Sequence, residues 1–443
     1  MKTEDIAGMT VFTTGEPAKQ LGVFRDAVLA LPTPALSTPL AKTDEFPDFC
    51  VYQGSIEMPV YQQGVPPFST EGGEWAVDAS GTPVLQRRET ARVFVTIPRT
   101  PMPAAGYPVV YLIGTGAGGD WALVDRGPQA MTGGPALDAG TGPALHFARV
   151  GYAGVTIDGP LEGPRNTTGG DEDFLIFNLQ NLVAMRDNLR QSALEVILDA
   201  KLIEQGVVAP DVSDCPGASG PVHFDMQHLG LMGHSMGASI LPLAAAWEPK
   251  YKAIILSGSG GSWIENIVYK QKPIEVRPFA EVLANEPAGS MTAFDPALTM
   301  VQWAAEEADS QVYGSMLAGR HLLMEQGIVD HYIMPRIANA TSLSVGLDLA
   351  GTPLDDNAEY VDQQKVLDLL PLVSHGALSY PVRGNKAGVT QVVVQHAGDG
   401  IEDGHEVVFQ TDPPKHQYRC FLKSWLSGTP VVVADDAADA PCP

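Results

Sequence analysis

The clearest chemical signal in the sequence is a serine between glycines, in the segment GHSMG at residues 233–237. The apolar run LGLM precedes this segment, and the small-residue stretch at 238–247, which is compatible with a helix, follows it. A serine on a tight turn from strand to helix needs small residues two positions away on either side, because larger side chains would collide there. A glycine-rich turn without chemistry is the alternative interpretation. The strand before and the helix after favour Ser235 as a nucleophile.

A serine hydroxyl is inert at neutral pH, so Ser235 needs a general base within hydrogen-bonding distance and a carboxylate to orient that base. When the nucleophile lies on such a turn, the acid and then the histidine follow it in the chain. His405 fits this order, because it lies in a loop rich in Gly and Asp after the apolar run at 391–395. His396, at the end of that run, is the rival base. His234 is expected to pack beneath the turn.

The acid is expected after the strand that comes before the histidine's strand. We predict it at Asp348, the first carboxylate at the end of the run SLSVGLD at residues 342–348. Four other carboxylates near this point or near His405 remain open as alternatives: Asp355, Asp356, Glu402 and Asp403.

Acyl transfer also needs two backbone N–H groups that face the developing oxyanion. One is predicted at Met236, directly after the nucleophile, and the other at Thr115 in the loop GTGAGG at residues 114–119, with Gly116 as its neighbouring alternative and a candidate substrate contact. Such a loop could instead bind phosphate, but it lacks the Lys-Ser/Thr of a P-loop and a well-placed ribose-binding acid. Trp263 is a second candidate substrate contact, with a purely structural role as the alternative.

Short apolar runs bounded by Gly and Pro alternate with helical patterns and predict an α/β fold with a mostly parallel, eight-stranded sheet. The predicted strands are residues 48–58, 91–99, 108–114, 154–159, 229–233, 253–258, 342–348 and 391–396. Between the fourth and fifth strands, residues 173–206 carry apolar side chains at helical spacing.

The segment between the sixth and seventh strands is too long for an ordinary connection, so residues 263–336 are predicted to form a helical cap. His321 and His331 fall in this cap and are expected to be surface or packing residues. The resulting organisation has the following parts: an N-terminal wrapping segment 1–47, a core in two parts at 48–262 and 337–429, the cap at 263–336, and a C-terminal tail 430–443.

The segments GHSMG, GTGAGG and the Asp-Gly-His at 403–405 together resemble the α/β-hydrolase superfamily over about residues 90–428. More narrowly, the chain is similar to large bacterial esterase or lipase-like hydrolases, through Gly-Pro-Arg-Asn at 163–166 and Arg-Asp-Asn at 186–188. The resemblance implies a Ser-Asp-His esterase with a cap over an acyl-binding pocket. Met236 and Trp263 are also similar to positions in polyester-cleaving, cutinase-like enzymes.

Two positions depart from the pattern of this group. The oxyanion loop begins with Ile113-Gly114, where relatives usually have His-Gly. Relatives also tend to place the acid three residues after the glycine at the strand end, where this chain has Leu349, so Asp348 requires a shift of one residue.

The 443 residues include 27 Lys and Arg against 52 Asp and Glu, a net charge of −25. Such an acidic surface repels phosphate, which excludes a nucleic-acid reader, and disfavours anionic substrates unless Arg165, Arg186 or Arg190 offsets the charge locally. No apolar run is long enough to span a bilayer. No metal or other cofactor is expected, since the acidic clusters at 171–173 and 399–403 lack EF-hand spacing. The oligomeric state is left open.

Cys50, Cys215, Cys420 and Cys442 are too scattered for zinc or redox motifs, and their even number is compatible with two disulfides. Cys442 has little purpose in a frayed tail unless it is tied to another residue. Residues 1–10 lack the pattern of a signal peptide. We therefore favour an exported chain without its leader over a cytoplasmic protein with four thiols.

Together these features predict a serine hydrolase that cleaves a carboxylic ester, on a small molecule or a polymer, through an acyl-enzyme intermediate. The alternatives are a polyester hydrolase, a peptidase or acyltransferase on the same fold, and a non-catalytic binding protein.

Overall fold

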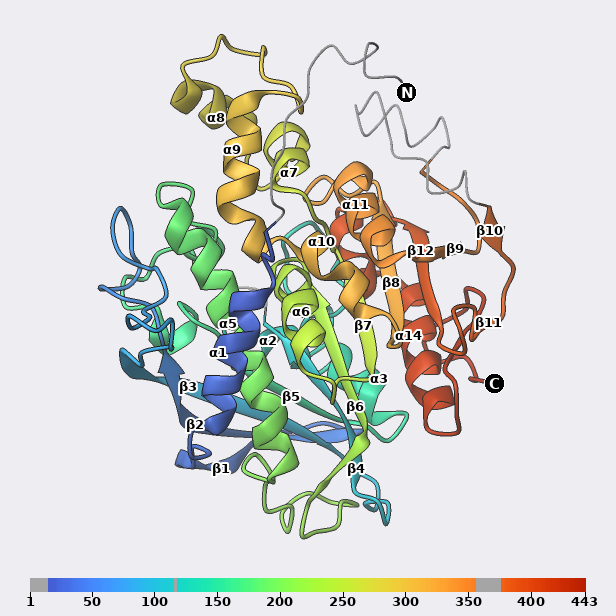
Figure 1. The fold of residues 1–443 in the computed structure, drawn as a ribbon. Coiled ribbons are helices and arrows are strands. Elements are labelled where there is room, and N and C mark those ends of the chain that lie inside the picture. The colour runs from blue at the N-terminus through green and yellow to red at the C-terminus, as the bar shows by residue number, and fades with distance from the viewer. Residues whose placement is uncertain (1–14, 115–117, 356–375) are drawn as a thin grey trace.

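The structure, a computed structural model, describes residues 15–114, 118–355 and 376–443 (Figure 1). The described residues form one large sheet of eleven strands and a separate two-stranded ribbon of β11 (Val382–Arg383) and β13 (Val431–Val432). The strands of the large sheet are β1 (Leu36–Glu45), β2 (Phe49–Val60), β3 (Arg87–Pro98), β4 (Tyr107–Ile113), β5 (Ala153–Ile157), β6 (Phe224–His234), β7 (Ala253–Ser257), β8 (His321–Ile328), β9 (Asp348–Ala350), β10 (Ala377–Leu378) and β12 (Gln391–Ala397).

The spatial order of the strands is β1-β2-β3-β5-β4-β6-β7-β8-β12-β9-β10. The pairs from β1 to β5 along this order are antiparallel, and all pairs from β5 to β10 are parallel. Strands β4, β5 and β7 are buried along their whole length, as expected for parallel strands that are covered on both faces. The mostly parallel α/β sheet predicted from the sequence is therefore confirmed.

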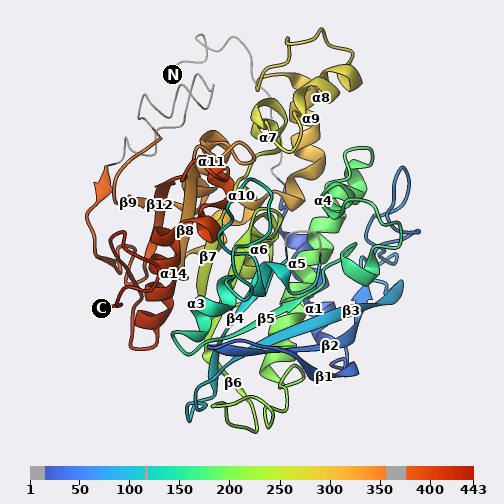
Figure 2. The ribbon, with the colours of Figure 1, turned by 180° about the vertical axis from the view of Figure 1, so that it is seen from behind.

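Helices cover both faces of this sheet (Figures 1 and 2). They are α1 (Lys19–Ala30), α2 (Trp121–Val124), α3 (Pro143–Ala148), α4 (Glu172–Ile176), α5 (Leu182–Glu204), α6 (Met236–Trp247), α7 (Trp263–Tyr269), α8 (Arg277–Ala284), α9 (Pro296–Ala305), α10 (Ser310–Tyr313), α11 (Pro335–Val345), α13 (Val407–Gln410) and α14 (Asp412–Trp425). Short 3-10 turns are η2 (Gly163–Arg165), η3 (Glu306–Ala308), η4 (Gly314–Leu317) and η6 (Gly404–Glu406).

The alternation of side chains along β4 divides the core in two. Tyr111 and its alternate neighbours pack in one cluster with α1, α5 and α6, whereas Val110 and Leu112 pack in a second cluster with α3 and α14. This is the two-sided burial that the near-continuous apolar run of β4 demands.

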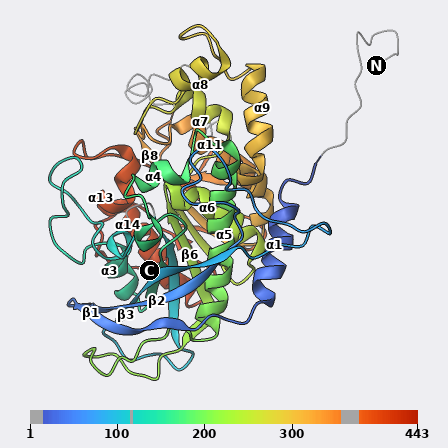
Figure 3. The same ribbon diagram turned by 90° about the vertical axis from the view of Figure 1, so that its left-hand side faces the viewer.

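Helices α7, α8, α9 and α10 come between β7 and β8 in the chain, and α7 and α8 extend beyond one end of the sheet (Figure 3). The helical insertion after the sixth predicted strand is thus present, but it is shorter than predicted. Residues 321–328 inside the predicted cap form β8, which pairs with β7 on one side and β12 on the other. The apolar pattern of β8 is interrupted by two buried polar residues, Glu325 and Gln326. Oε2 of Glu325 lies 2.6 Å from Nε2 of His396, and Nε2 of Gln326 donates to Oδ1 of Asn339 at 3.3 Å.

Two further strand predictions are corrected. Strand β1, at 36–45, lies in the segment that was predicted to wrap the core without a pattern. The predicted strand at 342–348 is mostly the end of α11, because Gly346 takes a left-handed conformation with φ of 79° and ends that helix. Only Asp348 from this range belongs to a strand, β9. The sheet has eleven strands among the described residues instead of eight.

The four cysteines form two disulfides. Cys50 on β2 is bonded to Cys215 in the connection before β6, and Cys420 on α14 is bonded to Cys442 near the C-terminus. The expectation that Cys442 is tied to another residue is confirmed. None of the described helices combines the length and hydropathy that a bilayer crossing requires.

The charged side chains of the Gly-Pro-Arg-Asn and Arg-Asp-Asn segments form ion pairs in the interior of the protein. The guanidinium of Arg165 is buried and donates to Glu195 on α5 at 2.6 and 2.8 Å and to Glu89 on β3 at 2.9 Å. Asp187 accepts from Arg186 and Arg190 on its own helix, and also from the backbone N–H of Trp75 at 2.8 Å. Arg165 thus joins α5 to β3, whereas Arg186 and Arg190 pair with Asp187 on α5 and with Glu307 on η3. Because all three arginines are engaged in ion pairs, they do not supply the local positive charge that the sequence left open.

Acid should destabilise the fold through His146 on α3, whose ring is buried edge-on against Tyr418. Burial lowers the pKa of His146 from 6.5 to about 3, so between these pH values the unfolded chain binds a proton that the folded protein does not. Stability is then complete above pH 6.5 and falls as the pH drops. Between pH 7 and pH 5, the free energy of unfolding of His146→Phe, measured with urea, should fall by about 2 kcal/mol less than that of the wild type.

The matched control is His223→Gln, which changes an exposed histidine. Equal pH sensitivity of the wild type and His146→Phe would contradict this account of His146.

Candidate active site

Ser235 lies at the sharp turn from β6 to α6. It has φ of 53° and ψ of −116°, a strained backbone conformation for a residue with a side chain. Its N–H donates to the carbonyl oxygen of Ser257 on β7 at 3.0 Å, which fixes the turn to the sheet. The sequence therefore folds locally as predicted, with strand, strained serine and helix in succession.

The two glycines of GHSMG are required because the backbone around them leaves no room for a Cβ atom. A Cβ atom on Gly233 would lie 2.6 Å from the carbonyl oxygen of Gly237, and one on Gly237 would lie 2.7 Å from that of Ile113 at the end of β4. Both distances are shorter than any normal contact, so each glycine allows the turn to close against its neighbours.

His405 is buried in η6, in the loop that follows β12. Its Nδ1 lies 2.9 Å from Oδ2 of Asp330, a buried carboxylate in the loop that follows β8. The other oxygen of Asp330 accepts the backbone N–H groups of Tyr332 and Ile333 at 2.8 and 2.7 Å. This pattern holds the carboxylate still and orients the His405 ring, as a histidine base requires.

The prediction of Asp348 as the partner of His405 is corrected by this geometry. Asp348 begins β9, on the far side of β12 from β8, and its carboxylate accepts from Lys386 at 2.6 Å and Asn385 at 2.8 Å. The sequence places residues 321–328 in the cap instead of in a strand, so the predicted acid follows the next strand along the chain. The available signal was the spacing from glycine to acid: Asp330 lies three residues after Gly327, at the end of β8.

The alternative candidates also lie elsewhere. Asp355 accepts from Asn339 at 3.2 Å, Glu402 accepts from the N–H of Gly133 at 2.6 Å, and Asp356 lies outside the described residues. The rival base His396 is buried against Glu325, with 2.6 Å between Nε2 and Oε2. None of these three described residues, Asp355, Glu402 and His396, contacts the ring of His405.

Glycines again permit the close approach of the loops. A Cβ atom on Gly258 would lie 2.6 Å from Cε1 of His405, and one on Gly327 would lie 1.7 Å from the carbonyl oxygen of Gly404. The end of β8 and the loop after β12 therefore pack backbone to backbone, which brings Asp330 within bonding distance of His405.

Asp403 connects the cap to both of these loops. Its carboxylate accepts the N–H of His405 at 3.1 Å, the N–H and Nδ1–H of His331 at 3.0 and 2.8 Å, and Nζ of Lys272 at 2.9 Å. Burial alone would raise the pKa of Asp403, but these donors hold it well below its usual range. His331 thus belongs to the acid loop, next to Asp330, and not to a surface of the cap.

The ring of Tyr332 stacks on that of His405 at 4.7 Å and an interplanar angle of 18°. The carbonyl oxygen of Tyr332 accepts Nζ of Lys270 at 2.8 Å, so the cap connection after α7 also fixes the residue that packs on the base. The imidazole therefore has a carboxylate at one nitrogen and an aromatic ring on its face.

Behind the turn, His234 packs beneath Ser235 as expected, with its ring 4.6 Å from that of His405. Burial, together with the Arg126 charge, lowers the pKa of His234 to about 3, so this ring is neutral at neutral pH. Burial alone would raise the pKa of Glu406, but Arg126, which donates to it at 2.6 and 3.1 Å, holds that pKa well below its ordinary value.

Among the described residues, one group brings three possible metal ligands within 4.8 Å of one another: His234, His405 and Glu406. Both oxygens of Glu406 are already engaged by Arg126, and Nδ1 of His405 is engaged by Asp330. The group has the residue types of a zinc site, but its charges are satisfied within the protein.

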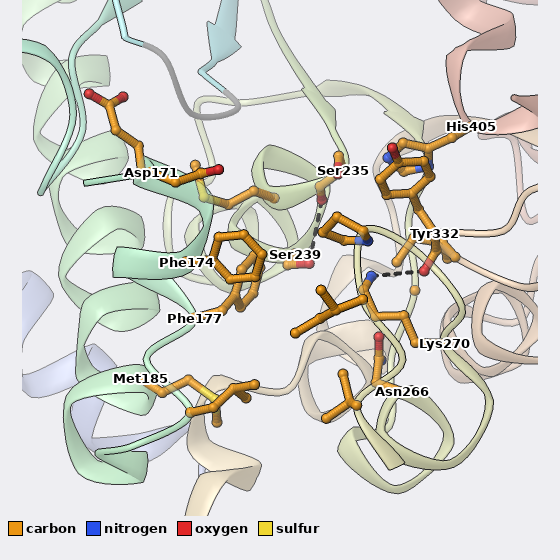
Figure 4. Close-up of a pocket in the computed structure, with 18 of the residues that line it drawn as sticks. Asp171, Phe174, Phe177, Met185, Ser235, Ser239, Asn266, Lys270, Tyr332 and His405 are labelled. Atoms are coloured by element: carbon orange, nitrogen blue, oxygen red, sulfur yellow. Dashed lines mark hydrogen bonds between the residues drawn. The ribbon is translucent and has the colours of Figure 1, made fainter. Parts of the chain in front are cut away.

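Ser235, Met236 and His405 line one cavity of about 850 Å³ beneath the cap (Figure 4). No hydrogen bond joins the Ser235 hydroxyl to the His405 ring in the described part of the chain, and such bonds commonly tighten only when substrate binds. Trp263, at the start of α7, also lines the cavity, and its indole N–H donates to the carbonyl oxygen of Ala305 at 3.0 Å. Thr115 and Gly116 lie outside the described residues.

No protein-family model and no curated protein matches the chain. Among solved structures, it is similar to the acetyl xylan esterase from Paenibacillus sp. R4, with 13% identity over 76% of this chain and 87% of that one and a TM-score of 0.47. It is also similar to the glucuronoyl esterase from Solibacter usitatus, with 13% identity over 93% of this chain and 92% of that one and a TM-score of 0.42. These scores are too low to indicate a substrate. The strand order, the turn at Ser235 and the chain order of Ser235, Asp330 and His405 are those of the α/β-hydrolase fold.

Proposed function

We propose that the protein is a serine hydrolase that cleaves carboxylic esters through an acyl-enzyme intermediate. The observation that carries the proposal is the bond between His405 and Asp330 at the edge of a cavity that also contains the strained Ser235. A buried histidine, oriented by a buried carboxylate and facing the same cavity as a half-buried serine on a tight turn, is the arrangement that activates a hydroxyl.

In the proposed reaction, Nε2 of His405 takes the proton of Ser235 as Oγ attacks the ester carbonyl. The Nδ1–H of His405 remains bonded to Asp330, whose negative charge stabilises the imidazolium that forms. The histidine then gives its proton to the leaving alcohol, and an acyl group remains on Ser235. Water, deprotonated by the same ring, attacks this acyl-enzyme, and Ser235 leaves with the proton to restore the starting state.

The oxyanion is proposed to lie at the N-terminus of α6. Met236 is the first residue of that helix, so its N–H has no acceptor within the helix and can donate to the developing charge. The second donor is proposed from Thr115, or from its neighbour Gly116. The neutral state of His234 suits this scheme, because a second positive charge beside His405 would oppose formation of the imidazolium.

Replacement of the nucleophile gives the first test of this proposal. Ser235→Ala should lower kcat toward p-nitrophenyl esters by a factor on the order of 10⁴ to 10⁶, because the attacking oxygen is gone. The matched control is Ser239→Ala, one helical turn further along α6, where the hydroxyl donates only to the carbonyl oxygen of Ser235 at 3.4 Å. It should stay within about tenfold of the wild type. Full turnover by Ser235→Ala would remove Ser235 from the mechanism.

The assignment of the triad acid is tested by two variants, each of which replaces an aspartate by asparagine. Asp330→Asn should lower kcat by a factor on the order of 10⁴, because an amide stabilises the wrong tautomer of His405. Asp348→Asn should keep turnover close to that of the wild type, since Asp348 bonds only Lys386 and Asn385 among the contacts described above. The reverse ranking of the two variants would show that the acid is Asp348.

A further inference from the structure

The cavity above Ser235 is much larger than a short acyl group requires. Its volume of about 850 Å³ lies near the upper end of the range of roughly 300 to 1,000 Å³ that is usual for ligand pockets. An acetyl group has three heavy atoms and takes up on the order of 100 Å³, if each atom occupies about as much space as a water molecule. A site built for acetyl esters would therefore leave most of this cavity unfilled by the acyl group.

Away from the reacting groups the lining is mostly apolar, although Asp171, Glu172 and Asn266 also belong to it. Figure 4 shows Ser235 and His405 toward one end and Met185 at the other, with Phe174 and Phe177 on the wall between them in this view. Met185 on α5 lines this end of the cavity and is buried, with 2% of its surface exposed. A chain that extends from the Ser235 acyl position toward Met185 would contact aromatic and thioether groups.

The cap contributes more apolar surface to the same wall. Ile267 on α7, Ile274 in the connection after it and Ala308 on η3 line the cavity. Ala308 is buried, with 1% exposed, and packs where η3 meets α5. Two elements far apart in the chain, α5 and the cap, thus enclose one apolar space.

Several polar side chains that line the cavity are engaged by the protein. Asp309 accepts the N–H groups of Ser262 and Trp263 and an N–H of Gln302, at 3.0, 3.3 and 2.7 Å. Nζ of Lys270 donates to the carbonyl oxygen of Tyr332. These groups hold the cap in place, and the apolar groups are left to contact a ligand.

Charge around the cavity disfavours an anionic chain. The lining carries two cations, Arg126 and Lys270, against four carboxylates, those of Asp171, Glu172, Asp309 and Glu406. Arg126 is paired with Glu406. A substrate with a carboxylate in its acyl part would have to enter past these groups in a protein of net charge −25.

From the volume, the apolar end and the charges, we infer that the acyl group is an uncharged hydrocarbon chain of medium length that extends from Ser235 to Met185. This inference rests on the proposed function, because it identifies the acyl specificity of the same site. Burial of each methylene along the apolar wall should raise kcat/KM by roughly fourfold. This is the factor that corresponds to about 0.8 kcal/mol per buried methylene.

The experiment measures kcat/KM for p-nitrophenyl acetate, butyrate, hexanoate, octanoate and dodecanoate below their aggregation limits. We expect a rise on the order of a hundredfold from acetate to hexanoate. Met185→Trp, which adds volume at the end of the cavity far from Ser235, should lower the ratio of octanoate to acetate kcat/KM by at least about tenfold. Met185→Ala, which lengthens the cavity, should move the maximum toward dodecanoate, and it serves as the second variant if Met185→Trp does not fold.

The matched control is Met291→Ala, a buried methionine of the cap that does not line the cavity and that should leave the chain-length profile unchanged. Labelling of Ser235 by a small fluorophosphonate shows that each variant keeps a folded site. A maximum at acetate, or a profile that neither Met185 variant changes, would overturn the inference while the proposed function stands. Absence of Ser235-dependent turnover on every ester would instead overturn the proposed function.

Discussion

The hydrogen bond between His405 and Asp330 is the interaction on which the site depends. The two residues are 75 positions apart in the chain, and they meet only because β8 and β12 are parallel neighbours whose ends lie at the same edge of the sheet. The backbone contact between Gly327 and Gly404 sets how closely the two loops approach. The strained Ser235 on β6 completes the same edge, so one property of the fold, the common direction of these strands, assembles all three side chains.

The cap is joined to this arrangement by polar contacts at the base and by apolar contacts along the cavity. Asp403 links Lys272 of the cap to His331 and His405, and Lys270 reaches the backbone of Tyr332. Any displacement of the cap connection would therefore change the positions of His405 and of the loop that carries Asp330. The same cap encloses the hydrophobic space above Ser235, which couples the chemistry to the shape of the acyl site.

Much of this could be predicted from the sequence, because the strongest signals are local. GHSMG specifies its own turn. His405 was predicted from its place in the loop after the last long strand, and in the structure this residue lines the cavity. The acid is harder to predict, because its strand contains the buried Glu325, whose partner His396 lies on the neighbouring strand far along the chain. The apolar run of β12 predicts that strand, but the polar pair Glu325 and Gln326 interrupts the pattern of β8, so the sequence places residues 321–328 in the cap and Asp330 is not predicted as the acid.

The central claim is that Ser235 is a nucleophile activated by His405. Its most direct test is the mass of the intact protein, followed by peptide mapping, after treatment with a fluorophosphonate. The account predicts a single adduct on the peptide that contains Ser235, formed rapidly by the wild type and lost in His405→Ala. An adduct on a different residue, or labelling of Ser235 at an equal rate without the imidazole, would contradict it.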